Sequence, residues 1–410
     1  MFKNAFFYTL AEIIKKLIPF LLLPLLSKEL TVPQFGALSN FNTLSSIVFI
    51  FIVMSSSGAF TVNYFKFNDE QRSRYAGNVL LFTIISGALF SLLFFLPWLD
   101  GWMMKLELNS IFWLHAVGFS IGQGFINLYS GFSRVTKNGI WILIYQIVFG
   151  FVNIGLTYYL FYALEDNLEA RIMAISSSHL ILGVFAILFI HRKLKINPKF
   201  DLEAFKDILK FGVPLIPHLI SGWLKSGVDK IFITLYLGTT VLGIYGFGFQ
   251  ISLGAMAFAQ ALNSSLAPDI YERLSKGIHP SKMRKLIGLF ALILFAGIVI
   301  YFFVIKIGFP ILFDIKFIES LDIFGFFLIA YFIKGVYMFN SNFIFYKKKN
   351  WLISSANIFS SVFYFILIYL FFEFKWVESI YFIPIILVLA EGILLALTLR
   401  NVNKLYNVER

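Results

Sequence analysis

Long apolar stretches separated by short polar segments run through the whole 410-residue chain. A helix needs about 20 largely apolar residues to cross the hydrocarbon core of a bilayer. Twelve stretches meet this length, six before a polar connector at 191–210 and six after it. The pattern therefore predicts twelve transmembrane helices, near 5–27, 37–62, 77–99, 110–132, 139–163, 170–190, 211–237, 240–262, 286–307, 320–345, 351–372 and 379–399.

The positively charged residues follow the same alternation. With both termini placed in the cytoplasm, the inside connectors hold 23 of the 34 Lys and Arg residues, and the outside connectors hold six. The remaining five lie within apolar stretches. Because cytoplasmic loops collect Lys and Arg, this bias predicts twelve spans with cytoplasmic N- and C-termini.

The connector divides the chain into two halves. Its end carries Leu202, Phe205, Ile208 and Leu209 at helical spacing, which predicts an amphipathic helix on the cytoplasmic surface. We expect an N-terminal lobe at 1–195, a connector helix at 196–210 and a C-terminal lobe at 211–410.

The two halves share a weak internal repeat. The segments "LTVPQFGALSNFNTLSSI" (30–47) and "LGTTVLGIYGFGFQISLG" (237–254) occupy corresponding places, and Gly36 aligns with Gly243. Six helices per half give both halves the same orientation in the membrane. The expected fold is all-α, with two six-helix lobes related by a pseudo-two-fold axis along the membrane normal and a central cavity between them.

Composition agrees with a multi-pass membrane protein. The chain is 59% hydrophobic and 19% aromatic, and its mean hydropathy is +0.83. The cytoplasmic connectors account for its net charge of +12, so we expect no nucleic-acid partner. The chain has no Cys, and its five His residues show no metal-ligand spacing, so no metal site or cofactor is expected.

The seventh apolar stretch contains charged residues, which are costly in a bilayer and functional by default. At 100° per residue, His218, Ser221, Lys225 and Asp229 fall on one polar stripe, and Lys225 and Asp229 can pair. Lys230 lies about 140° from Lys225 on this projection. The stripe predicts a hydrated cavity. The alternative is a contact between two helices that contains an ion pair, with the Lys230 side chain extending to the membrane–water interface.

Other charges lie in the first, tenth and twelfth stretches. Glu12, Lys15 and Lys16 fall near the middle of the first, unless that helix starts later and leaves the lysines at the cytoplasmic interface. Lys334 lies in the tenth, and Glu391 in the last is a candidate partner or proton carrier. The embedded cations outnumber the acids, so a cavity lined by them would attract anions.

The segment "FGVPLIPHLISGWLKSGVDKIFITLYLGTTVLGIYGFGFQIS" resembles the seventh and eighth helices of Wzx-type polysaccharide flippases. The opening segment "PLLSKELTVPQFGALSNFNTLSSI" is similar to the first two helices of that family. Its superfamily, the multidrug/oligosaccharidyl-lipid/polysaccharide (MOP) exporters, also contains MATE-type drug exporters and the lipid II flippase MurJ.

The resemblance implies a flippase that moves an undecaprenyl-pyrophosphate-linked oligosaccharide, such as an O-antigen repeat unit, across the bacterial inner membrane by alternating access. It implies that Asp229 and Lys230 match an acid–base pair of the family, and that Lys15 or Lys16 matches its basic first helix. This chain has Lys where many members have Arg. The bidentate phosphate binding that Arg provides is therefore not implied for this chain.

The partners expected from the resemblance are the lipid-linked substrate, membrane lipids and polysaccharide assembly proteins such as a polymerase and a chain-length regulator. We expect the protein itself to be a monomer. Lys225, Lys334, Lys16, Lys15 and Lys230 are the candidate substrate-binding cations. Asp229, His218, Ser221, Glu12 and Glu391 are the polar or ion-coupling candidates, and the coupling ion, Na⁺ or H⁺, is left open.

Three other functions compete with the flippase, and one of them is a membrane scaffold that transports nothing. A polytopic glycosyltransferase or ligase would need a sizeable outside loop with acids or a His, whereas the outside connectors here are short. An exporter of small cationic drugs in the same superfamily would need an acidic cavity, whereas this one is expected to be basic. We therefore expect a transport protein rather than an enzyme.

Overall fold

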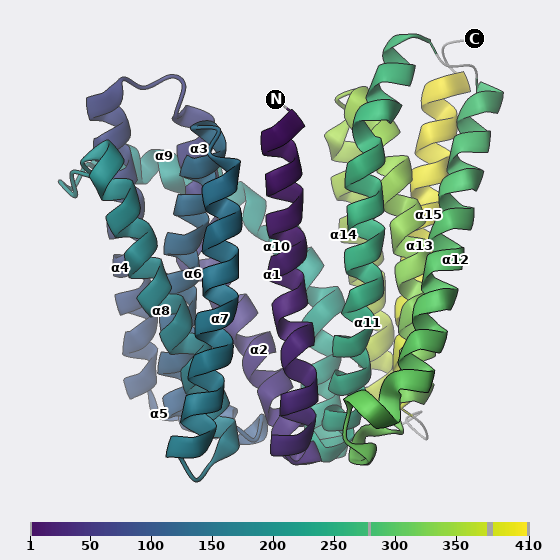
Figure 1. Cartoon of the computed structure of the whole chain (residues 1–410), viewed down its shortest axis with the longest axis horizontal. Helices are drawn as coiled ribbons and strands as arrows, with labels where there is room; N and C mark the ends of the chain where they lie inside the picture. The colour runs from purple at the N-terminus through teal and green to yellow at the C-terminus, as the bar shows by residue number, and fades with distance from the viewer. Residues whose placement is uncertain (1, 278–279, 375–379, 408–410) are drawn as a thin grey trace. The chain divides into compact units, whose positions relative to one another are not determined.

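The computed structural model describes residues 2–277, 280–374 and 380–407 (Figure 1). Every regular element in these residues is helical, which confirms the predicted all-α class. The chain divides into two compact units, one of Met1–Ile18 with Ala37–Trp223 and one of Pro19–Gly36 with Leu224–Arg410.

The first unit contains the helices of the N-terminal half, together with the connector helix. The first helix, α1 (Phe2–Glu29), contributes only its start, because the division falls beside Pro19 in its interior. The helix α2 (Val32–Val53) belongs to this unit from Ala37 onward, and its start up to Gly36 belongs to the second unit. The other elements are α3 (Ser56–Asn63), α4 (Asp69–Leu92), η1 (Leu93–Phe95), α5 (Pro97–Lys105), α6 (Ile111–Val135), α7 (Gly139–Ala163), α8 (Asn167–Leu194), α9 (Leu202–Gly212), η2 (Val213–Leu215) and α10 (Ile216–Trp223).

The second unit begins in the middle of the seventh predicted span. It contains η3 (Leu224–Val228), α11 (Asp229–Ser275), α12 (Pro280–Leu312), η4 (Ile315–Phe317), α13 (Ser320–Tyr346), α14 (Asn350–Glu373) and α15 (Phe382–Asn407). The connector helix α9 belongs to the first unit, whereas the sequence placed it between two lobes at 196–210.

The twelve predicted spans are present. Within the described residues, ten helical stretches are long and apolar enough to cross a membrane. One of them, 202–275, holds two spans joined at Gly238, whose φ of 82° interrupts the right-handed helix. Counting it twice and adding α1 gives twelve.

Two boundaries differ from the prediction. The span expected at 37–62 is broken into α2 and α3, because Met54 and Ser55 have φ of 43° and 55° and a right-handed helix cannot continue through them. The predicted surface helix forms as α9, which begins at Leu202 rather than at 196. Its start is set by Asp201, whose carboxylate accepts hydrogen bonds from the N–H groups of Glu203 and Ala204.

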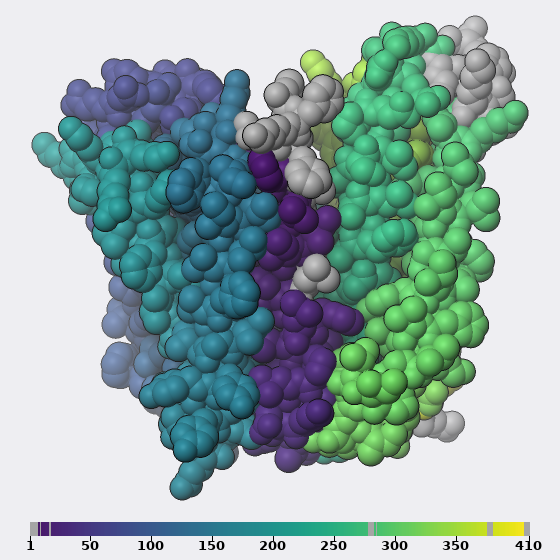
Figure 2. All heavy atoms as spheres, in the orientation of Figure 1, coloured from purple at the N-terminus to yellow at the C-terminus, as the bar shows by residue number. Residues whose placement is uncertain are grey.

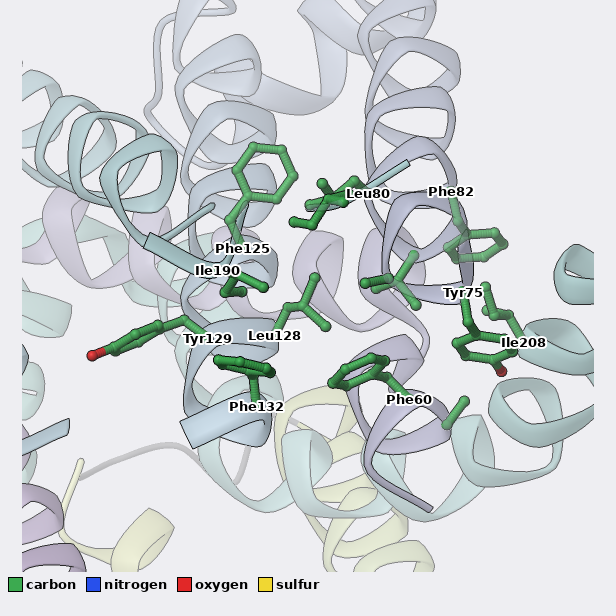
Figure 3. Packing of buried hydrophobic residues seen from close by; sticks show 14 of the residues in the cluster. Phe60, Tyr75, Leu80, Phe82, Phe125, Leu128, Tyr129, Phe132, Ile190 and Ile208 are labelled. Atoms are coloured by element: carbon green, nitrogen blue, oxygen red, sulfur yellow. The ribbon is translucent and has the colours of Figure 1, made fainter. Parts of the chain in front are cut away.

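Each unit has its own apolar core. In the first unit, aromatic and aliphatic side chains from α3, α4, α6, α8 and α9 pack together, among them Phe60, Phe82, Leu128, Ile190 and Ile208 (Figure 3). Lipid chains are as apolar as these residues, so close packing rather than exclusion from water stabilises the contacts. Ile208 is fully buried here, which anchors α9 to the spans.

The second unit packs η3, α11, α13, α14 and α15 around a separate core that includes Tyr245, Phe327, Tyr364 and Ile386. Its helix α12 is visible along its length in Figure 2, in green. Leu292, Ile300, Ile307 and Ile311 on this helix are more than half exposed. An apolar face of this length is suited to lipid contact.

The two glycines that align in the sequence repeat meet within the second unit. A Cβ atom on Gly36 would lie 2.0 Å from the carbonyl oxygen of Thr239, and one on Gly243 would lie 2.1 Å from that of Val32. Only the absence of side chains lets the start of α2 and the middle of α11 approach this closely.

Alanine at Gly36 or Gly243 is therefore expected to destabilise the protein by about 1–3 kcal/mol or more, because the added methyl group meets backbone that must move. Thermal unfolding of the purified protein in detergent measures the effect. Gly155→Ala on α7 is the matched control, since a Cβ there meets nothing within 4 Å. Equal unfolding temperatures for all three variants would contradict the packing argument.

Candidate functional site

The seventh span is irregular where its charged residues lie. Pro214 and Pro217 remove backbone donors near its start, and the span passes through the 3-10 turn η2, the helix α10 and the π-helical segment η3 before α11 begins. π-Helical turns are rare in proteins, and those that occur are often found at functional sites. Here the turn carries Lys225, and Asp229 and Lys230 follow it directly.

The first charged group joins three helices of the second unit. Lys225 Nζ on η3 lies 3.4 Å from Glu391 Oε1 on α15, and Lys334 Nζ on α13 lies 3.4 Å from the same oxygen. The contact between Lys334 and Glu391 that the sequence suggested is thus present. We call Lys225, Lys334 and Glu391 the lysine–glutamate triad.

The triad carries a net charge of +1 because two ammonium groups share one carboxylate. The side chains of Lys225 and Glu391 are 5% and 1% exposed, whereas that of Lys334 is 30% exposed. The second oxygen of Glu391, Oε2, has no hydrogen-bond partner among the described residues. A buried charge excess of this kind favours an anion at the open, Lys334 side.

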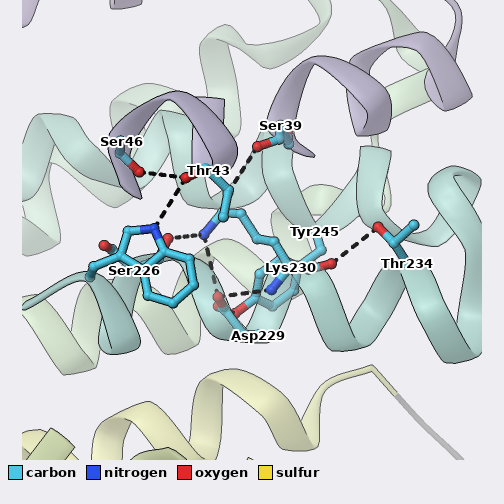
Figure 4. Close-up of polar contacts among 9 residues, drawn as sticks. Ser39, Thr43, Ser46, Ser226, Asp229, Lys230, Thr234 and Tyr245 are labelled. Atoms are coloured by element: carbon cyan, nitrogen blue, oxygen red, sulfur yellow. Dashed lines mark hydrogen bonds and ion pairs between the residues drawn. The ribbon is translucent and has the colours of Figure 1, made fainter. Parts of the chain in front are cut away.

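The second charged group follows η3 directly along the chain (Figure 4). Asp229 Oδ1 accepts the backbone N–H of Lys230 at 2.9 Å and lies 3.5 Å from Lys230 Nζ, while the hydroxyl of Tyr245 donates to Oδ2. Lys230 Nζ also donates to the carbonyl oxygen of Ser226 at 2.5 Å. Asp229 and Lys230 are both buried, so Lys230 does not reach an aqueous interface within the second unit.

The spacing of Lys225 and Asp229 allows them to pair in a regular helix, but the structure gives each a different partner. Lys225 pairs with Glu391, and Asp229 pairs with Lys230. A projection at 100° per residue assumes an unbroken α-helix, whereas a π turn takes one extra residue and rotates the rest of the helix by about 100°. Residues after η3 therefore present different faces from those that the regular projection assigns.

The remaining predicted residues belong to the first unit, and their roles stay predictions. His218 is exposed, and the buried Ser221 donates to its carbonyl oxygen at 2.7 Å. Glu12 is half exposed and pairs with Arg134 of α6 at 2.6 Å. Lys15 is exposed, and the side chain of Lys16 lies outside the described residues.

Arg171 on α8 is a buried cation that the sequence reading missed, because it falls at the edge of an apolar stretch and was counted with the outside connectors. One guanidinium nitrogen, Nη1, donates to Asn153 Oδ1 at 3.1 Å and to Thr157 Oγ1 at 2.6 Å, both on α7. No carboxylate within the described ranges forms an ion pair with it. In the sequence, the signal for this contact was the pair of polar residues Asn153 and Thr157, which lie one helical turn apart in an apolar stretch.

Arg171→Met is expected to destabilise the protein by about 1–3 kcal/mol, because it leaves the buried oxygens of Asn153 and Thr157 without their donor. Thermal unfolding in detergent measures the change. The exposed Lys105 supplies the control, and Lys105→Met is expected to stay within about 0.5 kcal/mol of wild type. An Arg171→Met protein as stable as the control would show that this network does not stabilise the first unit.

The described part of the chain contains no group of three or more His, Asp or Glu side chains that could hold a metal ion. The two charged groups at η3 in the second unit are the positive triad and, next to it along the chain, the neutral Asp229–Lys230 pair.

Comparisons with known proteins show a fold and a family. The chain has the fold of the MOP transporters: it resembles the lipid II flippase MurJ in an inward closed conformation with a TM-score of 0.72 (13% identity, 98% of this chain, 88% of that one). It also resembles an inward-facing MATE multidrug resistance transporter with a TM-score of 0.67 (14% identity, 98% and 96%).

Sequence comparison then assigns the family. Residues 1–274 match the profile of the family described as polysaccharide biosynthesis protein, and the chain belongs to that family. A protein of the Lsg locus of Haemophilus influenzae is 29% identical over 373 residues, which cover 89% of each chain. These findings confirm, at the level of this family, the resemblance drawn from the seventh and eighth helices. The solved structures that share the fold are those of transporters.

Proposed function

We propose that this protein is a flippase that moves an undecaprenyl-pyrophosphate-linked oligosaccharide from the cytoplasmic to the periplasmic leaflet by alternating access. Membership of the polysaccharide biosynthesis family supports a substrate of this class. The observation that carries the proposal is the lysine–glutamate triad, which places two cations on one carboxylate inside a membrane-spanning unit.

The chemistry of the triad suits a pyrophosphate. Without substrate, Glu391 neutralises half of the charge of Lys225 and Lys334 and holds both side chains in place. A phosphate oxygen that approaches from the partly exposed Lys334 can take the place of Glu391 as the partner of one or both ammonium groups. Lysine acts as a point charge rather than a bidentate fork, so it binds the phosphate without demanding one orientation.

The proposal includes the cellular setting. The protein lies in the bacterial inner membrane with both termini in the cytoplasm and works as a monomer. It receives its substrate at the cytoplasmic face and delivers it to polysaccharide assembly proteins, such as a polymerase and a chain-length regulator. Glu391 remains a candidate for proton coupling, because one of its oxygens has no described hydrogen-bond partner.

Deletion of the gene tests the proposal. We expect surface polysaccharide to disappear while lipid-linked repeat units accumulate on the cytoplasmic side, and we expect the intact gene to reverse both effects. Unchanged polysaccharide together with new sensitivity to small cationic compounds would favour an exporter of the MATE type. Accumulation of lipid II instead would point to the substrate class of MurJ.

A further inference from the structure

The ammonium group of Lys230 is held as a bound monovalent cation would be held. Its ligands are the carboxylate of Asp229 at 3.5 Å and the carbonyl oxygen of Ser226 at 2.5 Å. The ring of Phe249 covers it, with its centroid 3.8 Å from Nζ. Carboxylate, backbone carbonyl and aromatic face are the groups that bind alkali-metal or ammonium cations in proteins.

Hydrogen bonds hold the carboxylate of Asp229 in place, and the helix backbone holds the carbonyl group of Ser226. The backbone N–H of Lys230 holds one oxygen of Asp229, and the hydroxyl of Tyr245 holds the other. Ser226 lies in the π-helical segment, one turn before Lys230, so the lysine side chain folds back along its own helix to reach the carbonyl oxygen. The carboxylate is therefore oriented toward the place that the ammonium group occupies.

The charge and exposure of the Asp229–Lys230 pair differ from those of the triad. The triad has a net positive charge and a partly exposed lysine, whereas the Asp229–Lys230 pair is neutral and buried, with its two side chains 1% and 5% exposed. A buried ammonium group with satisfied partners gains little by releasing them for a phosphate. Lys230 was a candidate substrate-binding cation, and its surroundings favour a different role.

We propose that Lys230 is a tethered cation that permanently fills a monovalent-cation site formed by Asp229, Ser226 and Phe249. The consequence is that this site needs no Na⁺ from solution in the wild-type protein. Removal of the lysine side chain converts it into a site for a free small cation, because the negative charge of Asp229 is then left buried without a counter-charge.

The test measures sodium-dependent stability of the purified full-length protein in detergent, with choline as a cation too large for the site. Wild type is expected to unfold at the same temperature in sodium chloride and choline chloride. Lys230→Ala is expected to unfold at a lower temperature in choline and to recover by at least about 2 °C in a saturable way with sodium. Direct binding of radioactive sodium to Lys230→Ala, and not to wild type, is expected as well.

Two variants separate a cation site from general weakening. Lys230→Met keeps an apolar chain in the space, and Asp229→Asn combined with Lys230→Ala removes the carboxylate; neither is expected to respond to sodium. A Lys230→Ala protein that unfolds equally with and without sodium, or that never folds even when purified in sodium, overturns the proposal. So does saturable sodium stabilisation of wild type that Asp229→Asn removes. Because the readouts are stability and binding, they stand whether or not the proposed flippase activity is correct.

Discussion

Replacing Glu391 by glutamine is expected to destabilise the protein by about 3–5 kcal/mol and to abolish transport, because it leaves Lys225 and Lys334 beside each other without their shared carboxylate. Glutamine keeps the size of the side chain, so the effect reports charge rather than a cavity. Thermal unfolding of the purified protein measures the stability. Surface polysaccharide in complemented deletion cells, at matched protein levels, measures the transport.

A double variant distinguishes charge repulsion from other causes. Adding Lys334→Met to Glu391→Gln removes one of the two unbalanced cations and is expected to restore part of the stability without restoring transport. Glu203→Gln, an exposed acid on α9, is the matched control and is expected to leave both readouts unchanged. If Glu391→Gln is as stable as this control, the triad does not hold three charged groups.

Replacing Lys225 by methionine is expected to reduce transport about 10- to 100-fold, because one charge-assisted contact to a phosphate contributes about 1.5–3 kcal/mol. The fold is expected to survive, since Glu391 keeps Lys334 as its partner and the group becomes neutral. This combination of lost transport and retained stability separates Lys225 from Glu391. The measurement is surface polysaccharide in complemented deletion cells, with unfolding temperature measured in parallel.

Lys225→Arg is the conservative control, because it keeps a positive charge at the same place and is expected to retain a larger share of transport than methionine. Wild-type transport by Lys225→Met would show that the substrate anion does not use this lysine. Loss of transport with an equal loss of folded protein would assign Lys225 a structural role instead.

The individual ion pairs explain which contacts could be predicted from the sequence and which could not. Lys334 and Glu391 lie on regular helices, and the sequence could suggest their contact because a central lysine needs an acid from another helix. Lys225 and Asp229 seemed paired because they are four residues apart, but η3 lies between them and changes the face of the helix. Arg171 was assigned to a loop because it lies at the start of α8, and the one-turn spacing of Asn153 and Thr157 on α7 does not by itself reveal which side chain they bind.

The sequence by itself determined that this is a twelve-span membrane protein of the polysaccharide biosynthesis family with cations in its spans. A bilayer requires long apolar helices and excludes charges, so both features are visible in a linear pattern. Only the tertiary structure decided the partners of those charges. Lys225 and Glu391 are 166 residues apart, and their contact depends on the packing of η3, α13 and α15 and on a π turn whose hydrogen bonds leave no periodic signal in the sequence.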